Sequence, residues 1–345
     1  MSHSFSDFNY QQINDSYRLT IHPESTLTLD NYKQCRIFSL PDKRKELFDL
    51  HIEEISLKID NLFKEIDESS LEQVDKNCLK YIKDNLKKIL KADNKEMKIF
   101  IKYFKDNYPN SIGIEGQKKE EWHSLYKIIR DEIFEKEYDN WGKRKKYGTY
   151  EFVNKLDLKT CPYCNRNYTF IVDEETGKLR PEIDHFYPKS RYPFLAMSFY
   201  NLIPSCPICN HTKSSKIKEN LINPYDIKQD DFKFTYKPND ISFSEVESKK
   251  YNMDSFEIEF KNQNENIDIF KLDELYKQHK DIVVDLLMKK VYYPKSYIEE
   301  LENNFGFTKD DIYRYLLNNY QKEEDLHKRP LSKLIKDISE ELDLI

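Results

Sequence analysis

Two pairs of cysteines in the middle of the chain limit its possible folds more than any other feature. Cys161 and Cys164 enclose Pro-Tyr, and Cys206 and Cys209 enclose Pro-Ile, with residues 165–205 between the pairs. A Cys-x-x-Cys turn presents two thiolates to one ion, and two such turns complete a tetrahedral zinc site. Sulfur fills all four positions of such a site, so we expect a structural zinc ion with residues 165–205 folded between its two halves.

Redox chemistry and disulfides explain these cysteines less well. The first residues lack the basic and apolar regions of a signal peptide, and no stretch approaches the roughly 18 apolar residues that span a bilayer. We therefore expect a cytoplasmic protein without membrane contact, and disulfides are rare in that compartment. A thioredoxin-like site needs one such pair near a βαβ pattern, which the sequence does not show. Cys35 and Cys78 are isolated and are expected to be small buried hydrophobic residues.

The N-terminal part of the chain has helical periodicity. With 38% hydrophobic residues and only 6 glycines among 345 residues, the chain is apolar enough to fold and favours helices. Residues 1–40 show no clear period. Apolar residues at steps of three and four predict a helix from Pro41 to Ile66 and further helices over about 70–92, 94–107 and 118–138. Residues 141–148, with four consecutive cations, break this pattern and are expected to form a linker or a phosphate-contacting loop.

The pattern changes twice beyond residue 145. Residues 157–220 have the character of short strands, turns and one closing helix, whereas 232–236, 241–246 and 256–260 alternate as half-buried strands do. Helical periodicity returns from about 268 and ends in an amphipathic helix over 331–342. These patterns predict an α+β protein with three parts: a mostly helical region at 1–145 that offers an interaction surface, a core at 146–222, and strands then helices at 223–345.

Charge is distributed unevenly between these parts. The chain has a net charge of −6, which argues against nucleic-acid binding. Residues 143–218, however, contain 14 Lys/Arg against 7 Asp/Glu. Placement matters more than the total, so this segment is either a local phosphate-binding face or an ordinary solvated surface.

The polar residues between and after the cysteine pairs form a recognisable pattern. In order, the chain contains Glu182-Ile-Asp184-His185-Phe-Tyr-Pro188-Lys189-Ser190, then Asn201-Leu-Ile-Pro204-Ser205, then Cys209-Asn210-His211-Thr-Lys213. This pattern resembles the HNH, or ββα-metal, endonuclease superfamily, and its cysteine pairs resemble the endonuclease VII-like arrangement. The resemblance covers less than a fifth of the chain. It implies a zinc-stapled ββα-metal core between the two flanking regions.

The resemblance implies a role for each polar residue. His185 is the general base, because histidine titrates near working pH; its alternative is a structural histidine. Asp184 and Asn210 hold the catalytic Mg²⁺ or Mn²⁺, with His211 as the alternative to Asn210, because hard cations prefer oxygen ligands. Asn201 orients His185. Neighbouring side chains on a strand face opposite ways, so Asp184 and His185 need a bend or strand end to serve one site.

The expected function is a metal-dependent HNH endonuclease that hydrolyses phosphodiester bonds, with DNA favoured. Four cations, namely Lys189, Arg191, Lys213 and Lys216, are either phosphate contacts or solvated charges. The sequence around His185 also resembles that of HNH proteins from bacterial anti-phage systems. Among these, the Septu type pairs the nuclease with an ABC-like ATPase partner. The alternatives are a zinc-dependent nucleic-acid or protein-binding module that has lost catalysis, and a ribonuclease.

Overall fold

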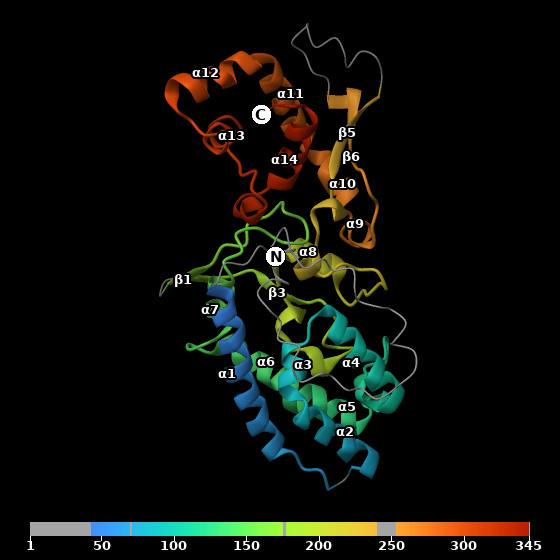
Figure 1. Cartoon of the computed structure of the whole chain (residues 1–345). Helices are drawn as coiled ribbons and strands as arrows, with labels where there is room; N and C mark the ends of the chain where they lie inside the picture. Colours follow the sequence, from blue (N-terminus) through green and yellow to red (C-terminus); the bar gives the residue numbers. More distant parts are fainter. Residues whose placement is uncertain (1–42, 70, 175–176, 240–252, 345) are drawn as a thin grey trace, which may run out of the picture.

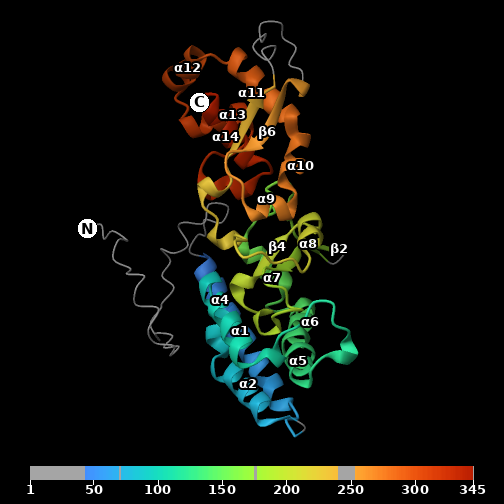
Figure 2. The ribbon, with the colours of Figure 1, turned by 90° about the vertical axis from the view of Figure 1, so that its right-hand side faces the viewer.

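The computed structural model describes residues 43–69, 71–174, 177–239 and 253–344 of an elongated molecule (Figures 1 and 2). The N-terminal helices lie at one end, the segment with the cysteine pairs lies in the middle, and the C-terminal helices lie at the other end. Among the described residues, no helix is long and apolar enough to cross a membrane. Residues 1–40, which include Cys35, and the predicted strand at 241–246 lie outside the described part.

Four helices confirm the periodicity of the first region. They are α1 (Lys43–Glu65), α2 (Gln73–Asp84), α3 (Leu86–Lys91) and α4 (Asn94–Asn107). The start of α4 is fixed locally, since the Asp93 side chain accepts from the Glu96 backbone N–H at 2.8 Å and the Glu96 carboxylate accepts from the Asp93 N–H at 3.0 Å. This reciprocal capping box satisfies two N–H groups that a helix start otherwise leaves unpaired.

The next helical segment differs from its prediction at both ends. It runs from α5 (Ser124–Lys127) through a seven-residue π-helix (Ile128–Phe134) into α6 (Glu135–Lys143), and α7 (Thr149–Leu156) follows. The expected linker therefore begins at Arg144, because Trp141 and Gly142 still belong to α6. Trp141 is fully buried, and Arg144 closes the helix end by donating to both Glu137 carboxylate oxygens at 2.7 Å. Arg144 is thus an intramolecular ion-pair partner.

The middle of the chain contains two small antiparallel sheets and one helix. The first sheet pairs β1 (Val172–Glu174) with β2 (Gly177–Leu179), and the second pairs β3 (Glu182–His185) with β4 (Leu202–Ser205). In the second sheet Asp184 lies opposite Ile203, and His185 lies opposite Leu202. Helix α8 (Pro207–Lys213) follows β4 directly and packs against β3. The chain therefore runs strand, strand, helix through the segment that carries the predicted site.

The last region has strands at two of the three predicted positions, followed by the predicted helices. Its elements are β5 (Phe234–Pro238), β6 (Phe256–Phe260), α9 (Glu265–Phe270), α10 (Leu272–Tyr276), α11 (Lys280–Tyr292), α12 (Lys295–Phe305), α13 (Lys309–Leu317) and α14 (Ser332–Glu341). Strands β5 and β6 pair antiparallel, and α14 packs against β5.

One apolar core connects the three regions. Buried hydrophobic residues form a single cluster that extends from α1 to α14, and Cys78 is buried within it as expected. Phe104 of α4 stacks on Phe194 of the middle segment with ring centroids 4.0 Å apart. The protein is therefore α+β, mostly helical, with small two-stranded sheets in its middle and C-terminal regions. The boundaries at 145 and 222 stay predictions.

Candidate metal centre and nuclease site

The four cysteines of the two pairs come together at the centre of the molecule. Their sulfur atoms all lie within 4.8 Å of one another, and all four residues are buried. A Zn–S bond of about 2.3 Å gives a tetrahedron with edges of about 3.8 Å. The 4.0 Å between the Cys164 and Cys206 sulfurs is close to that edge, so the cluster fits a four-coordinate zinc ion.

The surroundings of the sulfurs suit negatively charged ligands. The Asn167 amide donates to the Cys206 sulfur at 3.3 Å, and the Arg166 backbone N–H donates to the Cys164 sulfur at 3.4 Å. Burial raises the pKa of the Cys161 thiol. A bound cation opposes that shift by stabilising the thiolate, so the chemistry of the cluster also fits zinc.

Asn165, inside the first knuckle, ties the cluster to the end of the chain. This residue has a left-handed backbone with φ of 47°, which lets the turn close after Cys164. Its carbonyl accepts from the Leu331 N–H at 2.6 Å, its amide oxygen accepts from the Lys333 N–H at 3.1 Å, and its amide nitrogen donates to the Leu326 carbonyl at 3.1 Å. The turn of the first cysteine pair, the first knuckle, is therefore hydrogen-bonded to the segment that leads into α14.

Asp184 is buried on β3 and bonded through both carboxylate oxygens. Oδ2 accepts from the Tyr163 hydroxyl at 2.6 Å, and Oδ1 accepts from Lys213 Nζ at 3.1 Å. Burial raises the pKa of the Asp184 carboxyl and lowers the pKa of the Lys213 ammonium, while the ion pair opposes both shifts. Tyr163 lies between the first two cysteines, and Lys213 ends the helix that contains Cys209. Both partners of Asp184 thus come from segments that carry the clustered cysteines.

His185 is held as a neutral imidazole of one tautomer. Its ring lies beside the Tyr138 ring, with centroids 4.8 Å apart. The residue is 8% exposed, so little of it is accessible to solvent. Nε2 lies 3.0 Å from the Ala196 carbonyl. A carbonyl only accepts, so Nε2 carries the proton and Nδ1 keeps a lone pair. Burial, followed by the nearby Lys189, lowers the pKa of His185 to about 3.

Asn201 holds the loop that places the Ala196 carbonyl. Its side chain is fully buried; Oδ1 accepts from the Tyr187 N–H at 2.7 Å, and Nδ2 donates to the carbonyls of Tyr187 and Leu195 at 3.0 and 2.9 Å. The sequence predicted that Asn201 orients His185. Its side chain bonds to the backbone of Tyr187 and Leu195, and its own carbonyl accepts from the Phe186 N–H at 2.9 Å, so Asn201 acts on His185 through the backbone beside the ring.

Asn210 and His211 gather around a different carboxylate. Asn210 donates to Glu182 Oε2 at 2.7 Å, and His211 Nε2 lies 3.4 Å from Glu182 Oε1. Glu182 and Asp184 share one face of β3, because they are two residues apart on a strand. The predicted metal ligands therefore lie on the same side of the β3–β4 sheet, but Asn210 and His211 contact Glu182, whereas Asp184 pairs with Lys213.

The side chains of Asp184 and Asn210 offer the atom types that Mg²⁺ or Mn²⁺ prefers, but their present contacts do not suit a bound ion. Carboxylate and amide oxygens are the ligands that such ions prefer. Asp184 already has the Lys213 ammonium as its counter-charge, and Asn210 directs its amide nitrogen at the Glu182 carboxylate. The described arrangement does not fit a divalent ion bound between Asp184 and Asn210.

The four predicted phosphate contacts have unequal access to solvent. Lys213 is fully buried, so the expectation of a surface phosphate contact is wrong for the described conformation. Lys189 donates to Glu135 at 2.6 Å and lies 4.7 Å from the Tyr138 ring centroid. Arg191 is half-buried over the Tyr192 ring, and Lys216 is exposed. For these three residues the phosphate role stays a prediction.

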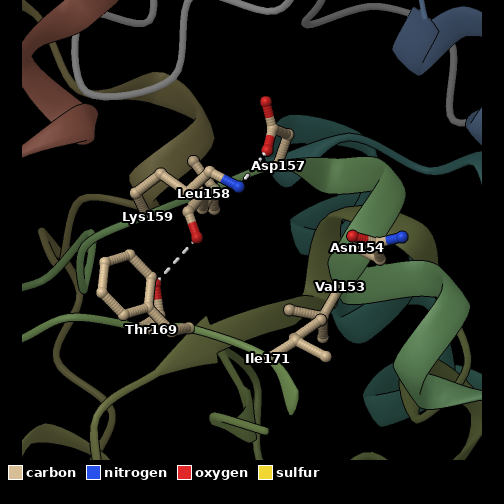
Figure 3. Close-up of a pocket in the computed structure, with 8 residues that line it drawn as sticks. Val153, Asn154, Asp157, Leu158, Lys159, Thr169 and Ile171 are labelled. Atoms are coloured by element: carbon tan, nitrogen blue, oxygen red, sulfur yellow. Dashed lines mark hydrogen bonds and ion pairs between the residues drawn. The ribbon is translucent and has the colours of Figure 1, made fainter. Parts of the chain in front are cut away.

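A small cavity lies away from these groups. It has a volume of about 130 Å³ and lies between the end of α7 and the segment 158–171 (Figure 3). Asp157 pairs with Lys159 at its rim, and Thr169 donates to the Leu158 carbonyl at 2.9 Å. None of the predicted site residues lines it, so we assign it no chemistry.

Comparison with known proteins gives one partial match. The chain is 38% identical over 72 residues to the Septu protein PtuB of Bacillus thuringiensis. The match covers 20% of this chain and 26% of that protein, so it spans about a quarter of the relative's length. No family model and no solved structure matches. The match supports the predicted link to Septu-type proteins over that segment.

Sequence reasoning missed two groups of the site. Tyr163 has one signal in the sequence, namely its position inside the first cysteine pair, which places it next to whatever folds between the knuckles. Tyr138 has none, because it belongs to α6 and reaches His185 only through the tertiary fold.

Proposed function

We propose that this chain is an HNH-type endonuclease that hydrolyses nucleic-acid phosphodiester bonds, with DNA as the favoured substrate. The observation that carries the proposal is the state of His185. Its Nε2–H is held by the Ala196 carbonyl, and its Nδ1 keeps the lone pair that a general base needs. The strand–strand–helix order of β3, β4 and α8, joined to a four-cysteine cluster, supports the same family.

His185 would take a proton from the attacking water at Nδ1. A pKa of about 3 is low for a base, which works best when its pKa lies near the operating pH. A bound phosphate adds negative charge beside the ring and favours the imidazolium. Substrate binding is therefore expected to strengthen the base, while the Ala196 carbonyl keeps the tautomer fixed.

A catalytic Mg²⁺ or Mn²⁺ ion belongs to the proposal as a cofactor to be tested. Such an ion would polarise the phosphate and stabilise the leaving oxygen. Since the bonds of Asp184 and Asn210 do not fit a bound ion, we derive no step through it. The zinc ion is proposed to be structural, because the cluster supplies four sulfur ligands.

The biological role is proposed from the partial match to a Septu protein. We propose that the chain acts in anti-phage defence together with a protein partner such as an ABC-like ATPase. The acidic flanking regions would contact the partner, and the basic segment 143–218 would face nucleic acid.

One observation favours a second candidate, a zinc-stapled binding module without catalysis. Asp184 is bonded to a buried lysine and a buried tyrosine, as a purely structural carboxylate would be. Such a module would bind nucleic acid or protein through the same surface without cleaving it.

Cleavage assays separate the two candidates. Purified protein is incubated with plasmid DNA and with RNA, with and without Mg²⁺ or Mn²⁺, alone and with the product of the neighbouring gene. We expect metal-dependent nicking of the plasmid and its loss in His185→Ala, by about 10²–10⁴-fold, with zinc content unchanged. The control is His123→Asn, which changes an exposed histidine and keeps an acceptor at the N-cap of α5. Binding without cleavage under all conditions supports the module, and cleavage of RNA alone would make the protein a ribonuclease.

A further inference from the structure

We propose that Lys213 is a positioning residue whose ammonium group is the resident cation of Asp184, and that a divalent metal ion binds Asp184 only by displacing it. This inference rests on the proposed function and concerns the same site.

The first support is the set of oxygens that surround the ammonium. Lys213 Nζ donates to Asp184 Oδ1 at 3.1 Å and to the His185 carbonyl at 2.7 Å. A carboxylate and a backbone carbonyl are the ligand types that a hard cation uses. These distances are those of hydrogen bonds and exceed the roughly 2.0–2.1 Å of a Mg²⁺ ligand bond. The Lys213 ammonium therefore occupies the position of a cation beside Asp184, but at hydrogen-bond distances from its oxygen neighbours.

The second support is burial. The Lys213 side chain is 0% exposed and that of Asp184 is 4% exposed, whereas lysine is rarely buried unless it is paired. A buried ammonium without its carboxylate loses both hydration and its counter-charge. The pair is thus held together tightly, and a metal ion must compete with it.

The third support is electrostatic exclusion. A divalent cation on Asp184 would lie within a few ångströms of the ammonium, and like charges at that distance repel strongly in a water-poor site. One buried carboxylate does not balance three positive charges. Displacement of Lys213 is therefore the condition for metal binding, and the negative charge of a substrate phosphate would favour it.

Lys213 also links metal binding at Asp184 to the position of the proposed general base, His185. Because the same ammonium donates to the His185 carbonyl, it fixes the end of β3 from which the imidazole projects. Tyr163 fixes the other oxygen of Asp184. Removal of Lys213 is expected to free Asp184 for metal while loosening His185.

The test measures metal binding without nucleic acid. Zinc-loaded protein is titrated with Mn²⁺, and free Mn²⁺ is followed by its electron paramagnetic resonance signal. Wild-type protein and Asp184→Asn should bind Mn²⁺ equally weakly, whereas Lys213→Met should bind at least about tenfold more tightly, because the competing charge is gone. This gain should vanish in the double variant Lys213→Met/Asp184→Asn. The matched control is Lys218→Met, which removes an exposed lysine from an exposed carboxylate 3.5 Å away and should leave binding unchanged.

Two outcomes would overturn the proposal. One is tight Mn²⁺ binding by wild-type protein that Asp184→Asn abolishes, a result that needs no Lys213 variant. The other is unchanged affinity in Lys213→Gln, a variant that keeps a donor for the His185 carbonyl without the charge and serves if Lys213→Met loses zinc or its fold. Neither outcome decides whether the protein cleaves nucleic acid, and a failure to cleave leaves the Mn²⁺ result intact.

Discussion

Replacement of Asn201 by alanine tests how the loop beside His185 is held. The substitution removes the partner of the Tyr187 N–H and of the Tyr187 carbonyl, while the Leu195 carbonyl keeps the Ser198 N–H at 3.1 Å. A buried polar group left without a partner costs about 1–3 kcal/mol, so two such groups predict a loss of roughly 2–6 kcal/mol. That is a large share of the roughly 5–15 kcal/mol by which ordinary proteins are stable.

Urea unfolding at pH 7, followed by circular dichroism, measures this loss. The matched control is Asn107→Ala, which removes an exposed amide that donates to the Tyr103 carbonyl of its own helix at 2.9 Å. A surface change of that kind should stay within about 0.5 kcal/mol of wild type. If Asn201→Ala also stays within that range, the amide does not hold the loop and our account of how His185 is positioned is wrong.

Three further predictions follow from the metal sites and from a remote histidine. Cys209→Ser should lose zinc and expose α8 to proteolysis, whereas the control Cys78→Ala, a change outside the cluster, should keep the zinc. Full zinc content in Cys209→Ser, measured by elemental analysis, would contradict the four-cysteine site. Brief EDTA treatment should stop cleavage, and Mg²⁺ or Mn²⁺ should restore it without added zinc; restoration by zinc alone would make zinc the catalytic ion. Burial lowers the pKa of His51 to about 4, so the unfolded chain binds a proton below about pH 6.5 that the folded protein takes up only near pH 4. The contribution of His51 to stability should therefore fall by about 2 kcal/mol between pH 7 and pH 5, and His51→Gln should reduce the pH dependence of the unfolding free energy by that amount; an unchanged pH dependence in urea unfolding would contradict this contribution.

Local signals predicted helix α4 and the cysteine cluster well, because both depend on residues close in sequence or on strict chemistry. The prediction of a helix over 94–107 agrees with Asn94–Asn107, and the capping residues Asp93 and Glu96 are visible in the sequence. The clustering of the four cysteines is confirmed as well. Their two-residue spacings leave few other arrangements for buried cysteines.

The error at Trp141 shows where local signals fail. Gly142 and the cations after it suggested a break, and glycine costs a helix about 1 kcal/mol relative to alanine. Trp141, however, packs its ring against Phe152 and His51, with centroids 5.2 and 5.9 Å apart. Burial of a large aromatic side chain outweighs that cost, and these partners are not neighbours in the sequence.

The misplacement of Lys213 has the same cause. A lysine four residues after the last cysteine, in a basic segment, is equally consistent with a phosphate contact and a buried ion pair. Only the packing of α8 on β3 decides between them, because it brings Lys213 to Asp184 across 28 intervening positions of chain. The clustering of the four cysteines was thus predictable from the sequence, whereas the pairing of Asp184 with Lys213 was not.

The bonds of Asn165 set an order in which this protein can be completed during synthesis. All four cysteines leave the ribosome well before residues 326–333, since translation proceeds from the N-terminus. Until those residues arrive, the Asn165 carbonyl and amide oxygen lack the bonds to Leu331 and Lys333 that they accept in the finished fold. The contact between Asn165 and residues 326–333 closes a long loop, and the entropic cost of closure rises only slowly with loop length. The contact still cannot form before residues 326–333 have been synthesised. The segment that carries the four cysteines is thus expected to mature only after residues 326–333 have emerged, and an excised fragment spanning 146–222 would lack the residues that close its first knuckle.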